Sequence, residues 1–584
     1  MIRQKIENKI AEILKGLGIA EPKVILDHPG ELAHGDYASN VALMYAKELK
    51  MKPSVLAEKV LVELGKEVLP EVEKMEIAGP GFINFYLAGQ YLKDNLSQIV
   101  SVGDKYGANN LLNGEKTVVE YTDPNPFKEF HIGHLMSNAI GESISRIVEA
   151  NGAEVKRACY QGDVGLHVAK AIYGMAKNYE NKKIIESDLL KFSVNDFVKL
   201  LGQWYATGAT AYEEDEKAKI SINEINKQVY ERDNKLVNNY YDFGREWSLK
   251  YFETIYKRLG TFHNKKENKA FDFYFFESKT GEFGKKIVEE NIGKVFEKSD
   301  GAIVFKAEQF DPKLHTRVFI NSEGLPTYEA KELGLAKIKY DTYQYEKSIV
   351  VTGNEINDYF KVLLKAMEFV FPDLAEKTKH ISHGMLRLPT GKMSSRTGKV
   401  ISAETIINQL VDLVLKRIAD RNFDIEQQKE ISESVAISAI KYTILKQASG
   451  SDIVFDFDKS VSFEGDSGPY VQYTAVRAGA LLEKGKVEGI VPKGEGDLGV
   501  GETVARILNK YPDIVERAGK EYAPHLIALY ALELASAFNG FYGAGKIVDA
   551  GDKNSPIKLL LTASVKQVLT NALGLLGISV PERM

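Results

Sequence analysis

Cysteine, tryptophan and long apolar runs are scarce in this 584-residue sequence. It has one cysteine, Cys159, which excludes an internal disulfide and a zinc site built from several thiolates. Its most apolar stretch, residues 523–545, contains His525 and Glu533, so we expect a buried bundle helix there and no membrane span. Charged residues interrupt the apolar positions of residues 3–9, unlike a signal peptide, and a cytoplasmic protein is expected.

A surplus of positive charge is also missing. Lys and Arg total 76 against 81 Asp and Glu, and the net charge of -5 argues against a surface that coats nucleic acid as a whole. A local basic groove is not excluded, and the 29 Tyr and 27 Phe could supply rings that stack on unpaired bases. The composition is that of a globular protein, and the length predicts about three or four domains.

Residues 117–141 predict a strand, a loop and the start of a helix. A β-branched and aromatic run comes first, Pro124 and Pro126 bar helix from the loop, and small and apolar residues then recur at helical spacing. Regular helix can therefore begin only near His131 and His134. The first turn of a helix has unpaired N–H groups and the positive end of the dipole, which favours a phosphate. We interpret the segment as an ATP site.

A second candidate segment, residues 391–398, places a lysine, two serines and an arginine between two glycines. That composition is typical of a flexible loop that grips phosphate. It follows a further βαβ pattern, in which residues 348–352 are predicted to form the last parallel strand, followed by a helix to about Phe369. Each segment alone also fits a capped or solvated turn, but the two in this order favour one nucleotide site.

His131-Ile-Gly-His134 resembles the HIGH motif of the class I aminoacyl-tRNA synthetases, and Lys392-Met-Ser-Ser-Arg396 stands where those enzymes carry the mobile KMSKS loop. Over nearly its full length, the sequence is similar to the arginyl-tRNA synthetases. The segments that carry this resemblance are residues 33–40, 78–86, 119–125, 162–165, 326–328 with Glu332, 462–473, 541–542 and 581–584.

The resemblance implies a multidomain architecture. Residues 1–110 are expected to form an N-terminal α+β domain that contacts the tRNA D-loop, and residues 406–584 an α-helical anticodon-binding domain. Between them, residues 111–405 are expected to form a Rossmann-type α/β catalytic domain, with a helical insertion at about 165–265. Periodicity alone predicts an amphipathic first helix with Ile2, Ile6, Ile10 and Leu14 on one face, and an aromatic strand at residues 271–276.

The implied activity is that of an arginine–tRNA ligase: ATP activates L-arginine to arginyl-adenylate, which is transferred to the terminal adenosine of tRNA(Arg). The resemblance assigns ATP binding to His131, Gly133, His134, Lys392, Ser394 and Ser395. Class I enzymes usually have a second lysine at the position of Ser395, and arginyl enzymes with this gap tend to carry one before the HIGH motif. Lys128 is therefore predicted to be catalytic, together with His131, His134 and Lys392.

A guanidinium is a planar fork of donors that needs carboxylate acceptors in a desolvated pocket. Acidic candidates occur where the carboxyl ends of strands are expected, at Glu120, in the adjoining loop at Asp123, and at Glu332. By resemblance, Glu120, Tyr328 and Glu332 line the side-chain pocket, and Asn125 holds the polar end of the amino acid.

Three positions depart from the family pattern. Asp123 is often serine in the family, Glu332 is usually aspartate, and Ile356 is glutamine or histidine in many members. The sequence leaves open whether Asp123 attracts the guanidinium or repels the carboxylate of the amino acid. Since Ile356 cannot hydrogen-bond, Glu355 or Asn357 is the alternative polar contact.

For tRNA, the resemblance implies that Phe82 and Asn84 contact a D-loop base and that Tyr470, Tyr473, Tyr542 and Met584 lie near the anticodon loop. Mg²⁺ is expected with ATP, but no pattern marks a dedicated metal site. We expect no membrane partner and a monomer, although the residues themselves do not determine the oligomeric state.

Two other functions remain open. One is a different class I synthetase, for glutamate, glutamine or lysine, of which the first two are disfavoured by the acidic pocket and the helical C-terminal part. The other is a non-catalytic tRNA-binding paralogue, which the intact His131, His134 and Lys392 disfavour.

Overall fold

The computed structural model of the chain describes residues 2–66, 69–180, 193–261, 268–387 and 402–584. It divides into two compact units. Unit 1 contains residues 1–107, 473–514 and 530–571, and unit 2 contains residues 108–472, 515–529 and 572–584. The predicted domain boundaries near residues 110 and 405 remain predictions.

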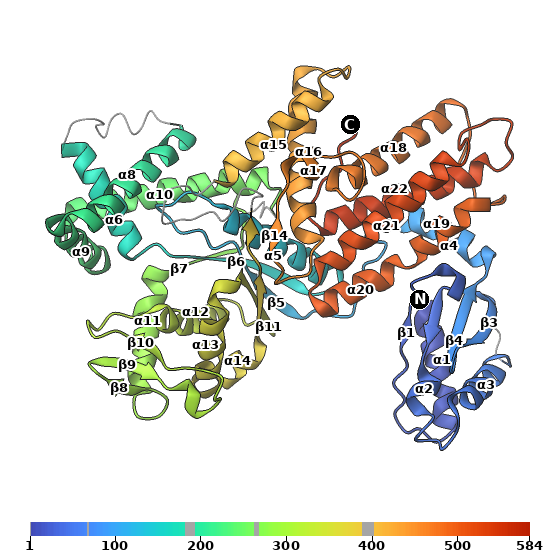
Figure 1. The fold of residues 1–584 in the computed structure, drawn as a ribbon, viewed down its shortest axis with the longest axis horizontal. Helices are drawn as coiled ribbons and strands as arrows, with labels where there is room; N and C mark the ends of the chain where they lie inside the picture. Colours follow the sequence, from blue (N-terminus) through green and yellow to red (C-terminus); the bar gives the residue numbers. More distant parts are fainter. Residues whose placement is uncertain (1, 67–68, 181–192, 262–267, 388–401) are drawn as a thin grey trace. The chain divides into compact units, whose positions relative to one another are not determined.

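The N-terminal part of unit 1 is a small α+β arrangement, as predicted. Its antiparallel sheet has the order β1-β2-β4-β3, with β1 (Leu26–Asp27), β2 (Tyr37–Ser39), β3 (Val72–Ala78) and β4 (Phe82–Leu87). The helices are α1 (Ile2–Gly16), α2 (Val41–Tyr45), α3 (Pro53–Leu64) and α4 (Gly89–Val102), in blue in Figure 1. The four apolar residues predicted for one face of α1 are all buried, which confirms the amphipathic first helix.

From residue 403 onward, the described chain is almost entirely helical, which confirms the predicted C-terminal bundle. The helices are α15 (Ala403–Ile418), α16 (Ile425–Leu445), α17 (Phe457–Ser460), α18 (Gly468–Val487), α19 (Glu502–Asn509), α20 (Tyr511–Glu521), α21 (Pro524–Gly543) and α22 (Ser555–Leu575). Two short strands, β13 (Leu386–Arg387) and β14 (Ile453–Val454), pair in parallel. The apolar segment that ends near Gly545 is α21, and no helix in the described ranges is long and apolar enough to cross a membrane.

Unit 2 is built on a five-stranded parallel sheet with the order β12-β11-β5-β6-β7. Figure 1 labels four of these strands, β11, β5, β6 and β7. The strands are β5 (Lys116–Glu120), β6 (Glu154–Gln161), β7 (Phe273–Phe276), β11 (Lys347–Gly353) and β12 (Thr378–His383). The chain winds outward from β5 in one direction and from β11 in the other, so β5 and β11 flank the point where the strand order reverses. In such sheets the ligand crevice lies at the carboxyl ends of the strands beside that point.

Helices and a small second sheet connect these strands. Helix α5 (Ile132–Ala150) joins β5 to β6, and α6 (Leu166–Glu180), α8 (Val194–Glu214), α9 (Glu216–Glu231) and α10 (Lys235–Arg258) lie between β6 and β7. After β7 come α11 (Glu277–Glu290), the antiparallel strands β8 (Glu297–Ser299), β9 (Ala302–Phe305) and β10 (Arg317–Ile320), and α12 (Tyr328–Thr342). Helices α13 (Asn357–Val370) and α14 (Pro372–Lys377) join β11 to β12. The predicted helical insertion thus falls on α6 and α8–α10.

One strand prediction is wrong. Residues 348–352 lie in β11, but β11 is not the last parallel strand, because β12 pairs with it along six residues from Thr378 to His383. The sequence of β12 is mostly polar, with Ile381 as its only aliphatic residue. An edge strand needs no apolar alternation on both faces, which is why the pattern did not reveal it.

Candidate active site

The loop between β5 and α5 is held in a strained conformation. Thr122, Asp123 and Phe127 all have left-handed backbone angles, with φ of 82°, 46° and 66°, which is rare for residues other than glycine. Hydrogen bonds hold all three residues. The Thr122 N–H donates to Ser137 Oγ at 2.9 Å, the Asp123 carboxylate accepts the Tyr160 N–H at 2.7 Å, and the Phe127 N–H donates to Ser248 Oγ at 3.0 Å. Strain that the surroundings enforce in this way clusters at functional sites.

Helix α5 begins at Ile132 with His131 as its N-cap, where the sequence predicts its start. The Gly133 N–H donates to His131 Nδ1 at 3.1 Å, and the His131 N–H donates to His134 Nδ1 at 3.2 Å. The two rings stack with their centroids 3.6 Å apart. Because both Nδ1 atoms accept, each neutral imidazole carries its proton on Nε2, and each ring keeps one N–H donor for a ligand. A Cβ at Gly133 would lie 3.0 Å from the His131 ring, so glycine makes room for this arrangement.

The electrostatics keep these histidines neutral. Burial, and then the charge of Lys128, lowers the pKa of His131 to about 4. Burial and the neighbouring His131 and Lys128 hold the pKa of His134 well below its usual value. Burial, and then the charge of Lys170, also lowers the pKa of Lys128, whose Nζ lies 5.5 Å from the centroid of the Tyr205 ring. The predicted lysine therefore lies close enough for its charge to act on both imidazoles.

Three predicted acids gather at the carboxyl end of β5. Glu120 is buried and pairs with Lys339 at 2.8 Å. Asp123 and Glu332 keep part of their surface exposed, but their carboxyl groups are enclosed. Burial, and then the charge of Glu120, raises the pKa of Asp123 well above its usual value and that of Glu332 to about 8. The Tyr359 hydroxyl donates to Glu332. One ammonium group cannot balance the charge of three ionised carboxyl groups, so this cluster can accept a second cation.

A fourth carboxyl group, Glu277, was not predicted from the sequence. It is the first residue of α11, directly after β7, and its carboxylate is buried beside Lys331 Nζ at 2.6 Å. Burial raises its pKa, although Lys331 opposes the shift, and its charge acts on Glu332. A Cβ at Gly162 would lie 2.5 Å from Asn125 Oδ1 and 3.0 Å from Glu277 Oε1, so these two side chains meet at one place. The available signal was an acid immediately after a parallel strand.

The other predicted pocket residues lie beside the Glu277–Lys331 pair. Asn125 Oδ1 accepts the Gly162 N–H at 3.1 Å. Tyr328, the first residue of α12, is 65% exposed, and its ring centroid lies 5.3 Å from Lys331 Nζ. Tyr230 of α9 accepts a hydrogen bond from Lys331 at 3.3 Å, so the helical insertion reaches the same place.

Three further predictions concerned Ile356, the basic loop around Lys392 and a metal site. Ile356 packs against the apolar core of α11–α13 and contributes no polar group. Lys392, Ser394 and Ser395 lie outside the described residues. Within the described ranges, no group of three or more His, Cys, Asp or Glu side chains is arranged to hold a metal ion.

In unit 1, Arg477 lies between two predicted RNA-contacting tyrosines. Its guanidinium carbon is 4.9 Å from the ring centroid of Tyr473 and 4.9 Å from that of Tyr542. Arg477 also donates to Asn539, and the Tyr542 side chain is exposed. Arg477 was not predicted, although a cation four residues after Tyr473 on α18 must share its face. Stacked aromatic and guanidinium planes suit unpaired bases.

The other predicted tRNA contacts differ in accessibility. Phe82, at the start of β4, is 39% exposed, whereas Asn84 on the same strand is 4% exposed. Tyr470 is half-buried at the start of α18, and Met584 is buried. Of these four residues, Phe82 offers the most open surface to a base.

Three family models match successive parts of the chain. Residues 1–87 match the arginyl tRNA synthetase N terminal domain, residues 95–457 match the catalytic domain of the class I tRNA synthetases (R), and residues 471–584 match the DALR anticodon binding domain. Together they account for the N-terminal α+β part, the parallel sheet with its surrounding helices, and the C-terminal helices.

Full-length relatives agree with these models. The chain is 31% identical to an arginine–tRNA ligase of Limosilactobacillus reuteri, with 100% of both chains covered, and 28% identical to that of Borrelia hermsii, with 100% of this chain and 99% of the relative covered. Among solved structures, the fold is similar to the arginyl-tRNA synthetase of Thermus thermophilus, with a TM-score of 0.83, 23% identity and 100% of both chains covered. The Plasmodium falciparum enzyme gives a TM-score of 0.74 at 20% identity, with 100% and 99% covered.

Proposed function

The chain belongs to the arginyl-tRNA synthetases of class I, and from this membership we propose how its residues carry out their reaction. The chain is an aminoacyl-tRNA synthetase that uses ATP to join arginine to tRNA. The arginine carboxylate attacks the α-phosphorus of ATP and diphosphate leaves. A ribose hydroxyl of the terminal adenosine of tRNA then attacks the carbonyl carbon of arginyl-adenylate, and AMP leaves.

The observation that carries the arginine assignment is the unbalanced acidic cluster. Glu120, Asp123, Glu277 and Glu332 are enclosed together with two ammonium groups, those of Lys339 and Lys331. We assign the guanidinium to the surplus carboxyl groups, which can accept it in the bidentate geometry that a planar fork requires. A glutamate side chain would find both ammonium groups already paired with Glu120 and Glu277, so its charge would stay buried and unpaired, which disfavours a glutamate enzyme.

Within this cluster, we assign Asp123 to the side-chain end of the substrate. Its carboxyl group interacts with Glu120 and Glu332, and the same group accepts the Tyr160 N–H, which fixes the side chain in place. This supports attraction of the guanidinium over repulsion of the α-carboxylate. Asn125 holds the polar end of the amino acid in this proposal, and Tyr328 borders the entrance beside Lys331.

The ATP subsite is assigned to the start of α5. His131 and His134 offer Nε2–H donors and stay neutral, so they stabilise developing phosphate charge by hydrogen bonds without competing for a proton. Lys128 supplies positive charge beside them. Lys392, Ser394 and Ser395, outside the described residues, are proposed to grip the β- and γ-phosphates. Mg²⁺ is proposed to arrive with ATP, held mainly by the phosphates.

The tRNA contacts follow the two terminal parts of the chain. Phe82 and Asn84 are proposed to meet the D-loop, and the Tyr473–Arg477–Tyr542 stack to meet the anticodon loop. Tyr470 and Met584 are proposed to contact the anticodon loop as well. The proposed domains are residues 1–110, 111–405 and 406–584. We propose that the protein acts as a monomer in the cytoplasm, where tRNA and ATP are present.

Amino-acid-dependent exchange of diphosphate into ATP tests the assignment. The purified full chain is assayed with arginine, lysine, glutamate and glutamine, with and without tRNA, and charging is followed with radiolabelled arginine. We expect exchange and charging with arginine alone, because lysine presents a point charge and no fork. Equal exchange with another of these amino acids would identify the chain as a synthetase for that amino acid. The absence of any charging would favour a non-catalytic tRNA-binding protein.

A separate experiment tests Lys128. Lys128→Met removes a charge beside both histidines, and we expect the kcat of exchange to fall by about a hundredfold, the usual cost of one transition-state donor. The matched control is Lys170→Met, because Lys170 is a neighbouring lysine whose partner is the exposed Glu213 at 3.8 Å. Equal kcat values for Lys128→Met and wild type would remove Lys128 from the mechanism.

A further inference from the structure

Helix α5 contains a row of buried polar residues that the proposed chemistry at its N-terminus does not use. Ser137, Asn138, Glu142, Ser143 and Ser145 each have at most 5% of their surface exposed. Buried polar groups destabilise a fold unless they are hydrogen-bonded, and each of these side chains has a partner. Glu142 and its neighbours on α5 connect three segments of unit 2: the turn after β5, strand β6 and the turn at residues 574–577.

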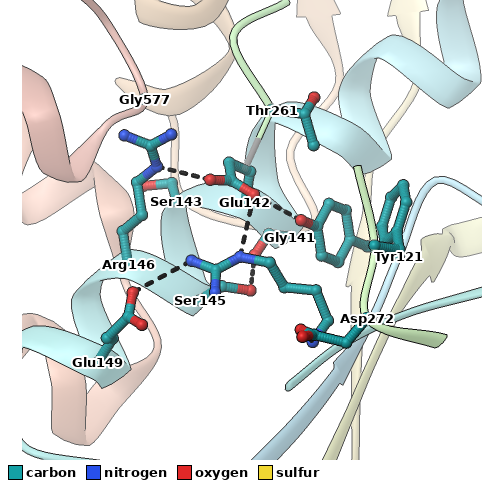
Figure 2. Close-up of polar contacts among 12 residues, drawn as sticks. Tyr121, Gly141, Glu142, Ser143, Ser145, Arg146, Glu149, Thr261, Asp272 and Gly577 are labelled. Atoms are coloured by element: carbon teal, nitrogen blue, oxygen red, sulfur yellow. Dashed lines mark hydrogen bonds and ion pairs between the residues drawn. The ribbon is translucent and has the colours of Figure 1, made fainter. Parts of the chain in front are cut away.

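The first partner is Tyr121, the residue that follows β5. Its hydroxyl donates to Glu142 Oε2 at 2.5 Å, and Figure 2 shows this contact from the ring to the helix. The Tyr121 ring is fully buried against α5 at Gly141, where a Cβ would lie 2.2 Å from the ring. Because Tyr121 stands between Glu120 and Asp123 in the chain, the contact fixes the backbone that carries both acids.

Two arginines keep Glu142 ionised. Arg146 Nε lies 2.6 Å from Glu142 Oε1, and Arg157 Nε of β6 lies 3.4 Å from Oε2. Burial opposes ionisation, but Arg157 and Arg146 hold the pKa of Glu142 below its usual value. Arg157 also pairs with Glu149 at 3.2 Å. The carboxylate therefore accepts from β6, α5 and the turn after β5 at once.

The third segment is the turn at residues 574–577, where α22 ends. Arg146 Nη1 donates to the Gly574 carbonyl at 3.1 Å, Ser143 Oγ donates to the Leu575 carbonyl at 2.9 Å, and Lys441 Nζ of α16 donates to the Gly577 carbonyl at 2.7 Å. The carbonyls at the end of a helix are unpaired and carry the negative end of its dipole, so cations and donors hold them well. Arg146 belongs to both groups of contacts, as Figure 2 shows for its side chain beside Glu142.

We propose that Glu142 is a positioning residue of adenylate formation, which acts through Tyr121 to hold Glu120 and Asp123 in place relative to α5, and that the turn at residues 574–577 braces the same network. The proposal rests on the proposed function, because it takes the two acids as part of the arginine pocket. The histidines at the start of α5 are held locally by their own capping contacts. Loss of the Glu142 contact therefore disturbs arginine binding more than ATP binding.

Two variants with little change in volume test the role. In Tyr121→Phe and Glu142→Gln, the KM for arginine in diphosphate exchange at saturating tRNA is expected to rise by about tenfold, with the KM for ATP changed by less than about twofold. The double variant is expected to lose little more than the worse single variant, because both changes remove one contact. Tyr121→Phe removes only a hydroxyl and keeps the test valid if Glu142→Gln folds poorly.

Adjacent residues of α16 supply the brace variant and the control. Lys441→Met removes the Nζ donor that holds the Gly577 carbonyl, and it is expected to raise the KM for arginine in the same direction but by less. Tyr442→Phe removes a buried hydroxyl that donates to Asp466 at 2.9 Å, outside the network, and should leave both KM values unchanged. An arginine KM within about twofold of wild type in Lys441→Met would remove the turn from the proposal.

Two results would overturn the positioning role itself. One is an arginine KM within about twofold of wild type in both Tyr121→Phe and Glu142→Gln. The other is an equal loss toward arginine and ATP that follows the folded fraction measured by circular dichroism. The wild-type assay separates this failure from that of the proposed function. If wild type shows no arginine-dependent exchange, the proposed function is wrong. If wild type is active and the variants have the same KM values, the proposed function stands and only the positioning role of Glu142 is wrong.

Discussion

Burial, followed by the charge of Glu120, raises the pKa of both Glu332 and Asp123. Both carboxyl groups are enclosed, and both feel the charge of Glu120, whose own partner is Lys339. With a pKa of about 8, the Glu332 carboxyl group stays mostly protonated in neutral solution unless a cation arrives to favour its ionised form. Binding of a guanidinium should therefore release a proton from the pocket, and arginine affinity becomes linked to pH.

The first prediction concerns that linkage. The pKa of Glu332 is raised to about 8, so below this pH the free enzyme holds a proton that arginine binding must displace. Arginine affinity should rise with pH up to about 8 and level off above it, by at most about tenfold per pH unit. The measurement is the KM for arginine in diphosphate exchange between pH 6.5 and 9, with the KM for ATP as the internal reference.

Glu332→Gln is the control, because it keeps the shape of the side chain and cannot titrate. Arginine itself titrates near the top of this range, and the variant shares that background, so the difference between the two profiles isolates the pocket. A wild-type profile parallel to that of Glu332→Gln would show that Glu332 is not the titrating group.

Residues that act singly were easier to predict than residues that act in pairs. Glu120, His131 and His134 could be placed from the strand, loop and helix pattern around them. The Glu120–Lys339 pair joins residues 219 positions apart, and no local pattern connects them. Glu277 could have been found, because it directly follows the aromatic strand that the sequence does predict. Its partner Lys331 could not, because only the folded chain brings α11 and α12 together.

At the scale of elements, the contact between β5 and α5 depends on Gly141. Its position brings the helix against the Tyr121 ring, and a Cβ there would lie 2.2 Å from a ring atom that cannot move without disturbing the strand end. Glycine in a helix interior normally costs stability, so its presence at this position follows from packing and not from helix propensity.

The second prediction follows from this packing. Gly141→Ala should destabilise the fold by about 1–3 kcal/mol through overpacking, despite the better helix propensity of alanine. Gly540→Ala in α21 is the matched control, because no atom lies within 4 Å of its added Cβ, and it should be neutral or stabilising by about 0.5–1 kcal/mol. Since two units unfold, the measurement is the temperature at which half of the exchange activity survives a fixed incubation. If Gly141→Ala lost half of its activity at the same temperature as Gly540→Ala, the packing argument would be contradicted.

Elements with a strong apolar period were predicted correctly, and polar ones were missed. Helix α1 has four buried apolar residues at four-residue spacing, and β5 has a β-branched run, so both were visible in the sequence. Strand β12 is an edge strand of mostly polar residues, and it takes its place by pairing with β11. Its conformation is therefore set by the sheet it joins and not by its own pattern.

At the scale of the whole molecule, the protein must bind an acidic polymer while carrying a net charge of -5. Long-range attraction by the protein as a whole cannot supply the affinity, so local contacts must. The catalytic model covers residues 95–457 and the DALR anticodon binding model covers residues 471–584, so the anticodon-binding part follows the catalytic part along the chain. This arrangement predicts that tRNA affinity and amino-acid activation can be altered separately.

The third prediction tests that separation in unit 1. Tyr542 is 43% exposed beside Arg477, and a base stacked on its ring would contribute about 1–3 kcal/mol. Tyr542→Ala should therefore raise the KM for tRNA in charging by about tenfold or more, while the KM values for arginine and ATP in exchange at saturating tRNA stay unchanged. Phe310→Ala, which removes a comparably exposed ring from unit 2, should leave the KM for tRNA as in wild type. An equal change of that KM in both variants would indicate a general loss of folded enzyme. If the KM for tRNA changed in neither variant, the stack around Arg477 would not be the anticodon contact, and the affinity would have to come from elsewhere in the DALR part of the chain.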